Sequence, residues 1–495
     1  MKISENWLRT WVNPAIDSDK LSDQLTMLGL EVDDLSPAAK PFTGVVVGEV
    51  LTVEQHPDAD RLRVTTVNIG AAEPLQIVCG APNVRVGMKA PVATIGAVLP
   101  GDFKIKKGKL RGIESQGMLC GASEIDLEDK IDGLLELPED APVGINIREY
   151  LDLDDNVIDI SITPNRGDCF SIRGIAREIG VINQLAVTTP DIKEVAATIS
   201  DEKQVVVSTE GCPRYLGRVI KNVNTKAATP AWMERALARS GIRQHSILVD
   251  ITNYVLMELG QPLHAFDAGQ VQGSVHVRQA TAGEKLVLLN EQEVELQDNV
   301  MVIADDEKAL AIAGIMGGLS SSVTDATTEI FLESAFFAPL AIAGRARSFG
   351  LHTDASQRYE RGVDFELPML AMHRASQLIA ELAGGEFGPI TVAENLNVLP
   401  TRDAIELNQA QVDQLLGYEV ASDFITDALT RLGCKVDVIA QGQWSVVPPS
   451  HRYDMAIYQD LIEEVARIHG YDNIQISLPV IDAQLAKYQD QFELG

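Results

Sequence analysis

The chain has 495 residues, and its 71 acidic residues outnumber its 41 basic residues, which gives a formal net charge of −30. Because 45% of the residues are hydrophobic, the composition excludes a disordered chain and a small disulfide scaffold, and the length predicts about three or four domains. The negative total also excludes a uniformly basic nucleic-acid coat.

Five cysteines lie far apart without a CxxC pair, a spacing typical of neither a zinc ribbon nor a disulfide framework. The N-terminus carries Glu5 and Asp17 and lacks the apolar stretch of a signal peptide. The longest weakly polar run, residues 309–319, is much shorter than the roughly 20 residues that span a bilayer. We therefore expect a soluble, cytoplasmic protein.

The first elements in the chain are helical and the next are strands. Residues 18–28 predict a short helix, which Ser18 can cap. Its leucines recur at helical spacing: Leu21, Leu25 and Leu28. Five or so short β-rich runs with Gly/Pro turns follow, up to about residue 124. This pattern predicts a small closed barrel, for which the OB-fold is the natural candidate.

The rest of the chain reads as one more helix, a linker and two mixed regions. Residues 165–183 predict a capped helix, with an apolar face of Ile172, Ile175, Ile179 and Ile182. A linker is expected at residues 188–201. Strand and helix patterns then alternate over residues 203–399, and a compact unit follows at residues 401–478.

Charge is unevenly distributed along the chain. Residues 81–112 carry a net charge of +6 and residues 211–250 one of +5, whereas residues 113–160 carry −12. Exposed charges are screened within about 8 to 10 Å, so a phosphate backbone responds to the local patch more than to the distant total. Two interpretations of the first basic stretch stay open, a solvated loop and an RNA-binding surface. Its basic residues are Arg85, Lys89, Lys104, Lys106, Lys107, Lys109 and Arg111.

Residues 451–474 predict a helix that ends at Gly470. One face is apolar and is expected to be buried: Ile457, Leu461, Val465 and Ile468. Carboxylates cluster on or just before the other face: Asp454, Asp460, Glu463 and Glu464. Such oxygens suit Mg²⁺, which one or two carboxylates usually hold in proteins. The alternative is a solvated acidic face that Arg467 neutralises in part.

The central region contains groups that hydrolysis of an ester needs. His264 lies in GQPLHAFD and Glu333 in FLESAFF, and GLHTDASQRYERG supplies Thr353 and Ala355. Imidazole, carboxylate, hydroxyl and backbone N–H groups can activate water and polarise a carbonyl. Purely structural roles are the alternative, since sequence distance does not show that these residues converge. The sequence has no GxSxG, HExxH or P-loop motif.

Several motifs resemble a known family. GEVLTVEQHPDADRLRVTTVNIG, IVCGAPNV and GKLRGIESQGMLCGASEI look like the tRNA-binding domain that several aminoacyl-tRNA synthetases share. In combination with ISITPNRGDCFSIRGIAREI, ILVDITNYVLMELGQPLHAFD and HRYDMAIYQDLIEEVARIHGYD, they resemble the bacterial phenylalanyl-tRNA synthetase beta subunits. The resemblance runs from residue 1 to beyond residue 476, in the domain order of the family.

The resemblance implies a multidomain α+β fold. An OB-fold β-barrel that binds tRNA, residues 40–150, would be inserted in a small helical N-terminal α+β domain, residues 1–39 and 151–199. A large α+β editing domain, residues 200–400, and a compact α/β winged-helix-like domain, residues 401–478, would follow. Residues 479–495 would begin a truncated C-terminal region, because the family's chains continue for roughly another 300 residues, through a synthetase-like and an anticodon-binding domain.

The resemblance also implies roles for single residues. The residues that match the editing pocket, which hydrolyses mischarged tyrosyl-tRNA, are His264, Glu333, Thr353 and Ala355. Further lining of that pocket is expected from Thr252, Asn253 and Gly317. The carboxylates that match the family's Mg²⁺ positions, at a site shared with the alpha subunit, are Asp454, Asp460, Glu463 and Glu464.

The implied enzyme is phenylalanine–tRNA ligase, with two alpha and two beta subunits, tRNA(Phe) and ATP as a substrate of the holoenzyme. Its synthetic active site is expected in the alpha subunit, with neither a membrane nor DNA as a partner. Two rival functions stay open: a non-catalytic tRNA-binding scaffold, and a metal-dependent hydrolase of small esters built on the cluster around Asp454.

Overall fold

The computed structural model describes residues 1–127 and 133–474. Its strands form several separate sheets with helices packed between them, a mixed α/β architecture. Among the described residues, no helix has the length and apolar character needed to cross a bilayer. All five cysteines are buried free thiols. The predicted final segment, residues 479–495, lies outside the described residues.

A three-stranded antiparallel sheet near the N-terminus joins two distant stretches of the chain. In spatial order its strands are β1 (Lys2–Ser4), β11 (Asn156–Ser161) and β2 (Glu31–Pro37). The helices of this part are α1 (Glu5–Trp11), α2 (Ser18–Met27) and α4 (Ile172–Asn183). The chain therefore leaves this sheet after β2 and returns to it at β11.

Helices α2 and α4 confirm the two helices expected in this region. The predicted cap of α2 is wrong by one residue, because the Asp17 carboxylate, not Ser18, accepts the hydrogen bond from the Lys20 N–H at 2.8 Å. Ser171 caps α4, where its hydroxyl accepts from the Gly174 N–H at 3.0 Å. An exposed carboxylate at the first turn also interacts favourably with the helix dipole.

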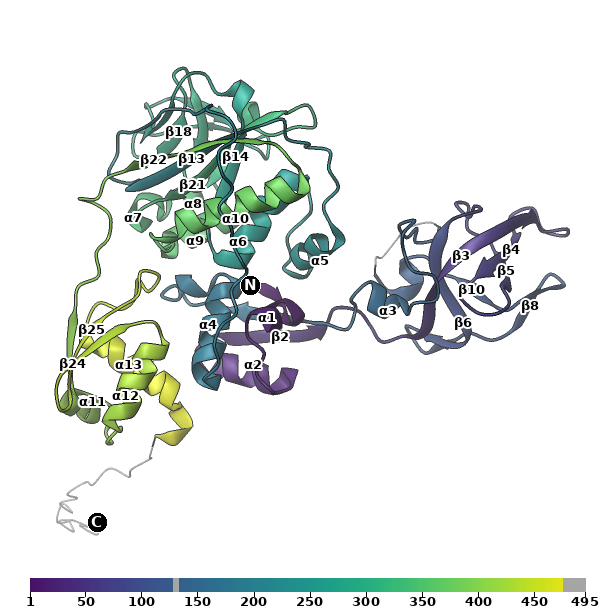
Figure 1. Cartoon of the computed structure of the whole chain (residues 1–495), viewed down its shortest axis with the longest axis horizontal. Coiled ribbons are helices and arrows are strands. Elements are labelled where there is room, and N and C mark those ends of the chain that lie inside the picture. The colour runs from purple at the N-terminus through teal and green to yellow at the C-terminus, as the bar shows by residue number, and fades with distance from the viewer. Residues whose placement is uncertain (128–132, 475–495) are drawn as a thin grey trace, which may run out of the picture.

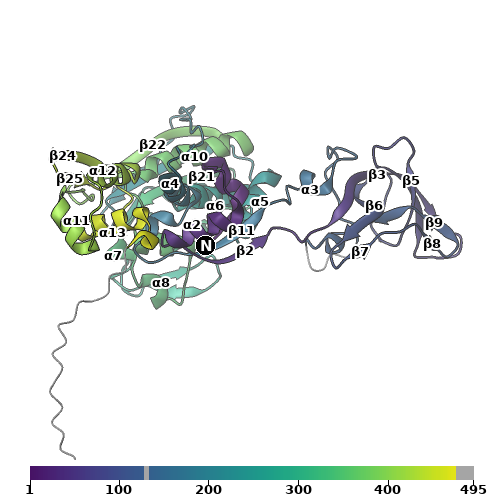
Figure 2. The same cartoon turned by 90° about the horizontal axis from the view of Figure 1, so that it is seen from below.

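Between β2 and β11 the chain builds a strand-rich part, which stands apart from the body of the molecule in Figures 1 and 2. Its main sheet has the order β10-β6-β3-β4-β5, with β7 paired to β6. The strands are β3 (Thr43–Gln55), β4 (Arg63–Asn68), β5 (Leu75–Cys79), β6 (Lys89–Leu99), β7 (Phe103–Lys104), β8 (Gly108–Leu110), β9 (Ile113–Ser115) and β10 (Gly117–Leu119). Strands β8 and β9 form a separate hairpin, and the short helix α3 (Ile147–Tyr150) leads back to the body.

The central part contains two sheets and a hairpin. The four-stranded sheet has the order β14 (Leu263–Asp267), β21 (Glu329–Phe336), β13 (Arg214–Lys221) and β22 (Glu386–Glu394). The five-stranded sheet has the order β12 (Val205–Val207), β15 (Val275–Gln279), β18 (Met301–Ala304), β19 (Ala309–Ile312) and β20 (Met316–Gly317). The hairpin pairs β16 (Lys285–Val287) with β17 (Glu293–Glu295).

Alternating side chains give the four-stranded sheet two buried faces. On β13, Leu216 and Ile220 join the core formed with the helices, whereas Tyr215 and Val219 join the core shared with the five-stranded sheet. Successive residues of a strand point to opposite faces, so one strand serves both cores. The helices of this part are α5 (Ala231–Arg239), α6 (Ile247–Leu259), α7 (Pro339–Ile342), α8 (Arg345–Ser348), α9 (Asp354–Arg361) and α10 (Leu367–Leu382).

The C-terminal part is a three-stranded antiparallel sheet with three helices, β23 (Ile405–Asn408), β25 (Gln443–Val447), β24 (Lys435–Ala440), α11 (Gln409–Leu416), α12 (Ser422–Arg431) and α13 (Tyr458–His469). Trp444 lies in its core and donates from Nε1 to the Thr426 hydroxyl at 2.8 Å. The helix predicted before Gly470 is α13, with Leu461, Val465 and Ile468 buried as expected. Ile457 precedes the helix and is 53% exposed, which corrects its predicted burial.

Candidate functional site

His264 and Glu333 lie opposite each other on neighbouring strands. Strands β14 and β21 pair antiparallel in a register that matches these two residues. Both side chains lie on the face that also carries Phe266 and Phe331, which pack into the core between the two sheets. In the motifs LHAFD and FLESAFF, the alternation of inward- and outward-facing residues along each strand therefore buries one polar side chain, His264 in the first and Glu333 in the second.

A small cavity of ≈ 70 Å³ lies against these two side chains. Gly317 and Ala355 also line it, so four of the residues predicted for the pocket come together. The rest of the wall is mainly apolar and comes from β19, residues 313–316, Pro262, Leu263, Ile303 and Tyr359. A cavity of this size holds only a few water molecules.

Glu333 is a buried ionisable group of this cavity whose acidity the fold alters. Its side chain is 7% exposed, and burial raises its pKa to about 7 because a carboxylate loses hydration there. The Tyr215 hydroxyl opposes this rise by donating a hydrogen bond to Oε2 at 2.8 Å. Near neutral pH the carboxyl group is therefore divided between its charged and neutral forms.

His264 has a buried ring nitrogen without a partner. No described side chain or backbone group forms a hydrogen bond with its Nε2, and burial lowers its pKa to about 4. The ring lies edge-on to Phe266, with the centroids 4.4 Å apart. A Cβ on Gly317 would come within 2.6 Å of the imidazole Cε1, so the glycine makes room for the ring. At neutral pH His264 is an uncharged imidazole with a free hydrogen-bonding atom.

Thr353 supports the cavity from outside. Its hydroxyl accepts from the Ser356 N–H at 3.1 Å as the cap of α9 and donates to the Ile315 carbonyl at 2.9 Å. Ile315 and Ala355 both line the cavity. Thr353 itself is not among the residues that line the cavity, and its hydroxyl links α9 to the cavity wall.

Thr252 and Asn253 are not among the residues that line this cavity. Both lie on α6, whose apolar residues belong to the core on the opposite face of the four-stranded sheet. The Thr252 hydroxyl is used within its own helix, where it donates to the Val249 carbonyl at 2.8 Å.

Two buried tyrosines at the site are absent from the sequence-based prediction. Tyr215 contacts Glu333 as described above, and the Tyr359 hydroxyl donates to the Ala335 carbonyl at 3.0 Å. The signal available in the sequence was the alternation in RYLGRV, which points Tyr215 to the same side as Val219. Knowing that β13 pairs with β21 would have been needed to connect it with Glu333.

The four carboxylates proposed for Mg²⁺ do not form one cluster. Both oxygens of Asp454 accept hydrogen bonds from Arg452, at 2.8 Å each. Glu464 is buried between Arg452 and Arg467, at 2.8 and 2.5 Å. Asp460 accepts from two backbone N–H groups before α13, and Glu463 is exposed. As they lie here, these residues do not fit a shared metal ion, and Arg467 does not pair with Glu463 as the alternative interpretation held.

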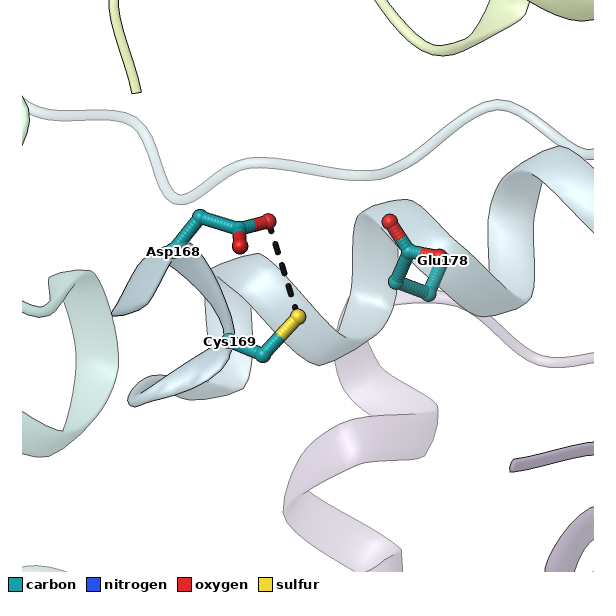
Figure 3. Close-up of side chains that lie close together, drawn as sticks. All are labelled: Asp168, Cys169 and Glu178. Atoms are coloured by element: carbon teal, nitrogen blue, oxygen red, sulfur yellow. Dashed lines mark hydrogen bonds between the residues drawn. The ribbon is translucent and has the colours of Figure 1, made fainter. Parts of the chain in front are cut away.

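A second acidic group, Asp168, Cys169 and Glu178, has metal-like spacing but already holds a cation. Figure 3 shows the three side chains converging beside α4, with the Cys169 thiol donating to Asp168 at 3.5 Å. Nη2 of Arg166 donates to all three, at 3.0 Å to Asp168, 3.1 Å to Cys169 and 2.7 Å to Glu178. The guanidinium occupies the place that a metal ion would need.

The basic residues of the strand-rich part divide into two sets. Arg85 pairs with Glu136, Lys107 with Glu114 at 2.5 Å, and Lys89 donates to two backbone carbonyls. The exposed residues Lys104, Lys106 and Lys109 line an open groove of ≈ 660 Å³ together with Phe103, which is 59% exposed. Arg111 is exposed on the hairpin turn between β8 and β9. Three lysines and an aromatic ring are therefore available on one concave surface.

Three family models match the chain, each over one of these parts. The description "Putative tRNA binding domain" applies to residues 45–146, "B3/4 domain" to residues 211–384, and "tRNA synthetase B5 domain" to residues 405–471. The cavity with His264 and Glu333 lies in the second of them.

Known proteins are similar to the chain from end to end. It is 81% identical over 495 residues to a phenylalanine–tRNA ligase beta subunit from Acinetobacter baylyi and 60% identical over 501 aligned positions to one from Psychrobacter arcticus. All of this chain is covered in both cases, and the chain spans 62% of each of these relatives.

Among solved structures, an N-terminal fragment of the phenylalanyl-tRNA synthetase beta subunit from Pyrococcus horikoshii matches 66% of this chain and 95% of its own, at 16% identity and a TM-score of 0.31. That low score adds nothing to the assignment, which rests on the sequence identities. Over its whole length, the chain is homologous to the phenylalanine–tRNA ligase beta subunits and carries their tRNA-binding, B3/4 and B5 domains in order.

Proposed function

We propose that this chain is part of the beta subunit of a phenylalanine–tRNA ligase. In that enzyme it binds tRNA and hydrolyses mischarged tyrosyl-tRNA(Phe). The observation that carries the proposal is the convergence of Glu333 and His264 on one buried cavity within the B3/4 domain. Phosphate-binding and tyrosine-recognising groups lie on separate parts of the chain, which suits a substrate as large as tRNA.

Hydrolysis of this kind has a physical reason. A synthetic pocket shaped for an apolar ring rejects an isostere with one added hydroxyl by only about 10²-fold. A second site gains selectivity if it binds the hydroxyl itself, because the smaller amino acid then leaves a buried polar group without a partner. Glu333 is such a group, since burial strips its carboxylate of water.

In the proposed reaction Glu333 accepts a hydrogen bond from the tyrosyl phenol, which phenylalanine cannot supply. The free Nε2 of neutral His264 holds the attacking water or the ester. Ala355 lies in the first turn of α9, where backbone N–H groups unused within the helix favour negative charge on a carbonyl oxygen. Because the cavity measures ≈ 70 Å³, its wall must move to admit a tyrosyl ring.

For the strand-rich part we propose an OB-fold that binds tRNA through the groove with Lys104, Lys106 and Lys109. Closure of the barrel is supported by the Gln116 N–H, which donates to the Gln76 carbonyl at 2.8 Å and so connects the two ends of the main sheet. Exposed aromatic rings next to lysines are typical of single-stranded RNA sites, where bases stack and phosphates pair.

The remaining expectations concern the whole enzyme. We propose an alpha subunit as partner in a tetramer of two alpha and two beta chains, with ATP and Mg²⁺ used in the synthetic reaction, in the cytoplasm. The domain limits given above and a winged-helix-like fold for residues 401–478 belong to the same proposal.

The test compares release of amino acid from tyrosyl-tRNA(Phe) and phenylalanyl-tRNA(Phe) by the 495-residue chain. We expect faster release of tyrosine, and loss of that release in Glu333→Ala and in His264→Ala. Binding of tRNA without release would favour the non-catalytic scaffold. Release that survives both substitutions together would show that the site lies elsewhere.

A further inference from the structure

The carboxylate of Glu333 is held at one oxygen. The Tyr215 hydroxyl donates to Oε2 at 2.8 Å, and no other described side chain forms a hydrogen bond with this carboxylate. Tyr215 is completely buried on β13, and Glu333 is 7% exposed on the adjacent strand β21. A buried tyrosine hydroxyl usually has a partner, and here that partner is Glu333.

We propose that Tyr215 is a positioning residue for selectivity, since it fastens Oε2 of Glu333 and so presents Oε1 to the phenol of a bound tyrosyl group. This inference rests on the proposed hydrolysis of tyrosyl-tRNA and adds to it a residue that controls the selectivity. A carboxylate has lone pairs on both oxygens, so one can serve as an anchor while the other binds the ligand.

Among the side chains that surround Glu333, Tyr215 is the one that stabilises the charged form of the Glu333 carboxylate. The titratable side chains that face Glu333 are Cys212 and Tyr215 near or on β13, His264 on β14 and Tyr359 on α9. All four are uncharged at neutral pH, because burial raises the pKa of the thiol and both phenols and lowers that of His264 to about 4. The hydrogen bond from Tyr215 therefore keeps the pKa of Glu333 at about 7 instead of higher.

Selectivity for tyrosine must then rise with pH as Glu333 ionises, since a charged acceptor forms the stronger hydrogen bond with a phenol. Removal of the Tyr215 hydroxyl takes one hydrogen bond from a charged group, which corresponds to an upward shift of about one to two pKa units. At pH 7 the ionised fraction then falls about 5- to 50-fold. Raising the pH must restore it.

The experiment measures, from pH 6 to pH 9, the ratio of kcat/KM for tyrosyl-tRNA(Phe) to that for phenylalanyl-tRNA(Phe). The spontaneous hydrolysis of each ester is subtracted first, and the ratio then cancels any pH dependence that both enzymatic reactions share. In the wild type this ratio should rise with pH, and the midpoint of the rise is the quantity compared between variants. In Tyr215→Phe we expect this midpoint to move up by about one to two pH units and the ratio at pH 7 to fall about 5- to 50-fold, with recovery toward pH 9. Glu333→Gln must abolish the pH dependence.

The matched control is Tyr254→Phe. Tyr254 is also buried, and burial together with a glutamate, Glu258, raises the pKa of its phenol, but the residue lies on α6 across the sheet from the cavity. Removal of the Tyr254 hydroxyl must leave the midpoint of the selectivity ratio at the same pH as in the wild type. If Tyr215→Phe does not fold, 3-fluorotyrosine at position 215 keeps the shape and strengthens the donor, and it must move the midpoint down.

The possible results separate this inference from the proposed function. A selectivity midpoint that is the same in the wild type, in Tyr215→Phe and with 3-fluorotyrosine overturns the inference and leaves the hydrolysis standing. A wild-type chain that neither releases tyrosine nor binds free L-tyrosine in preference to L-phenylalanine overturns both. A loss of selectivity in Tyr215→Phe that high pH does not restore also overturns the inference, because a damaged fold would explain it.

Discussion

Glu333 and His264 are titratable side chains placed where water is scarce, and burial acts on them in opposite directions. It raises the pKa of the glutamate to about 7 and lowers that of the histidine to about 4, because both prefer their neutral forms there. The site is thus built from two groups that the fold holds at a cost. Such a cost is common where function, not stability, selects the residue.

The stability cost of Glu333 can be measured against pH. The unfolded chain loses this proton near the ordinary pKa of 4.5 and the folded chain near 7, so the contribution of Glu333 to stability is lost as pH rises through that window. Glu333→Gln lacks this loss. We expect its free energy of unfolding, relative to the wild type, to increase by about 2 kcal/mol between pH 5.5 and pH 8.

Urea denaturation at the two pH values checks this expectation. Glu463→Gln, an exposed glutamate on α13, serves as the control and must follow the wild type. An equal pH dependence in Glu333→Gln and the wild type would mean that Glu333 is not buried as described.

At this scale the sequence predicted the residues of the cavity only where motif and strand pattern coincided. His264, Glu333, Gly317 and Ala355 do meet. Tyr215 escaped notice because its importance depends on strand pairing across more than 100 residues, as the Tyr215–Glu333 separation of 118 shows. Thr252 is not among the lining residues, and its helix α6 contributes apolar side chains to the core on the other face of the sheet.

At the scale of elements, helices α4 and α13 are joined by buried ions. Glu178 of α4 accepts from Arg166 at 2.7 Å and from Arg467 of α13. Arg467 also forms a salt bridge with Glu464, and Glu464 forms another with Arg452. All of these side chains are at most 5% exposed. The sequence suggested a metal cluster here because the carboxylates recur along one segment, and their spacing does not show that Arg452 and Arg467 of the same segment pair with Asp454 and Glu464.

Disrupting this buried salt-bridge network must destabilise the contact between the N-terminal and C-terminal parts. Glu178→Ala leaves Arg166 and Arg467 without their shared acceptor, and removal of one partner from a buried pair costs about 3–5 kcal/mol. We expect a loss of this size in chemical denaturation, together with faster hydrogen exchange in α13. Asp23→Ala, which removes an exposed pair with Lys20 at 3.9 Å on α2, must change stability by less than about 1 kcal/mol. Equal effects of the two substitutions would contradict this account.

At the scale of the whole molecule, a net charge of −30 coexists with a local basic surface. The sequence located that surface but could not say which cations are available. Arg85 and Lys107 have acidic partners, whereas Lys104, Lys106 and Lys109 face the groove with Phe103. Strand order, more than composition, determines this division, because β7 and the β8–β9 hairpin bring the three lysines together.

The salt dependence of tRNA binding tests this division. Each lysine that contacts phosphate contributes about 0.7 to 0.9 to the slope of log K against log salt concentration. Replacement of Lys104, Lys106 and Lys109 by alanine must therefore reduce the slope by about 2 to 3. Lys285→Ala, which removes an exposed lysine paired with Glu293 in the central part, must leave it unchanged. If the triple variant keeps the wild-type slope, the three lysines do not contact phosphate and the groove is only a solvated surface.

The return of the chain to its first sheet has a consequence for synthesis on the ribosome. Strand β11 lies between β1 and β2, so the first two strands lack their common neighbour until Ser161 has left the exit tunnel. The strand-rich part emerges complete before then. The ion pair from Arg467 to Glu178 forms later still, because these two residues are 289 positions apart. The N-terminal part thus begins to fold early and gains its contact with α13 only after Arg467 has been synthesised.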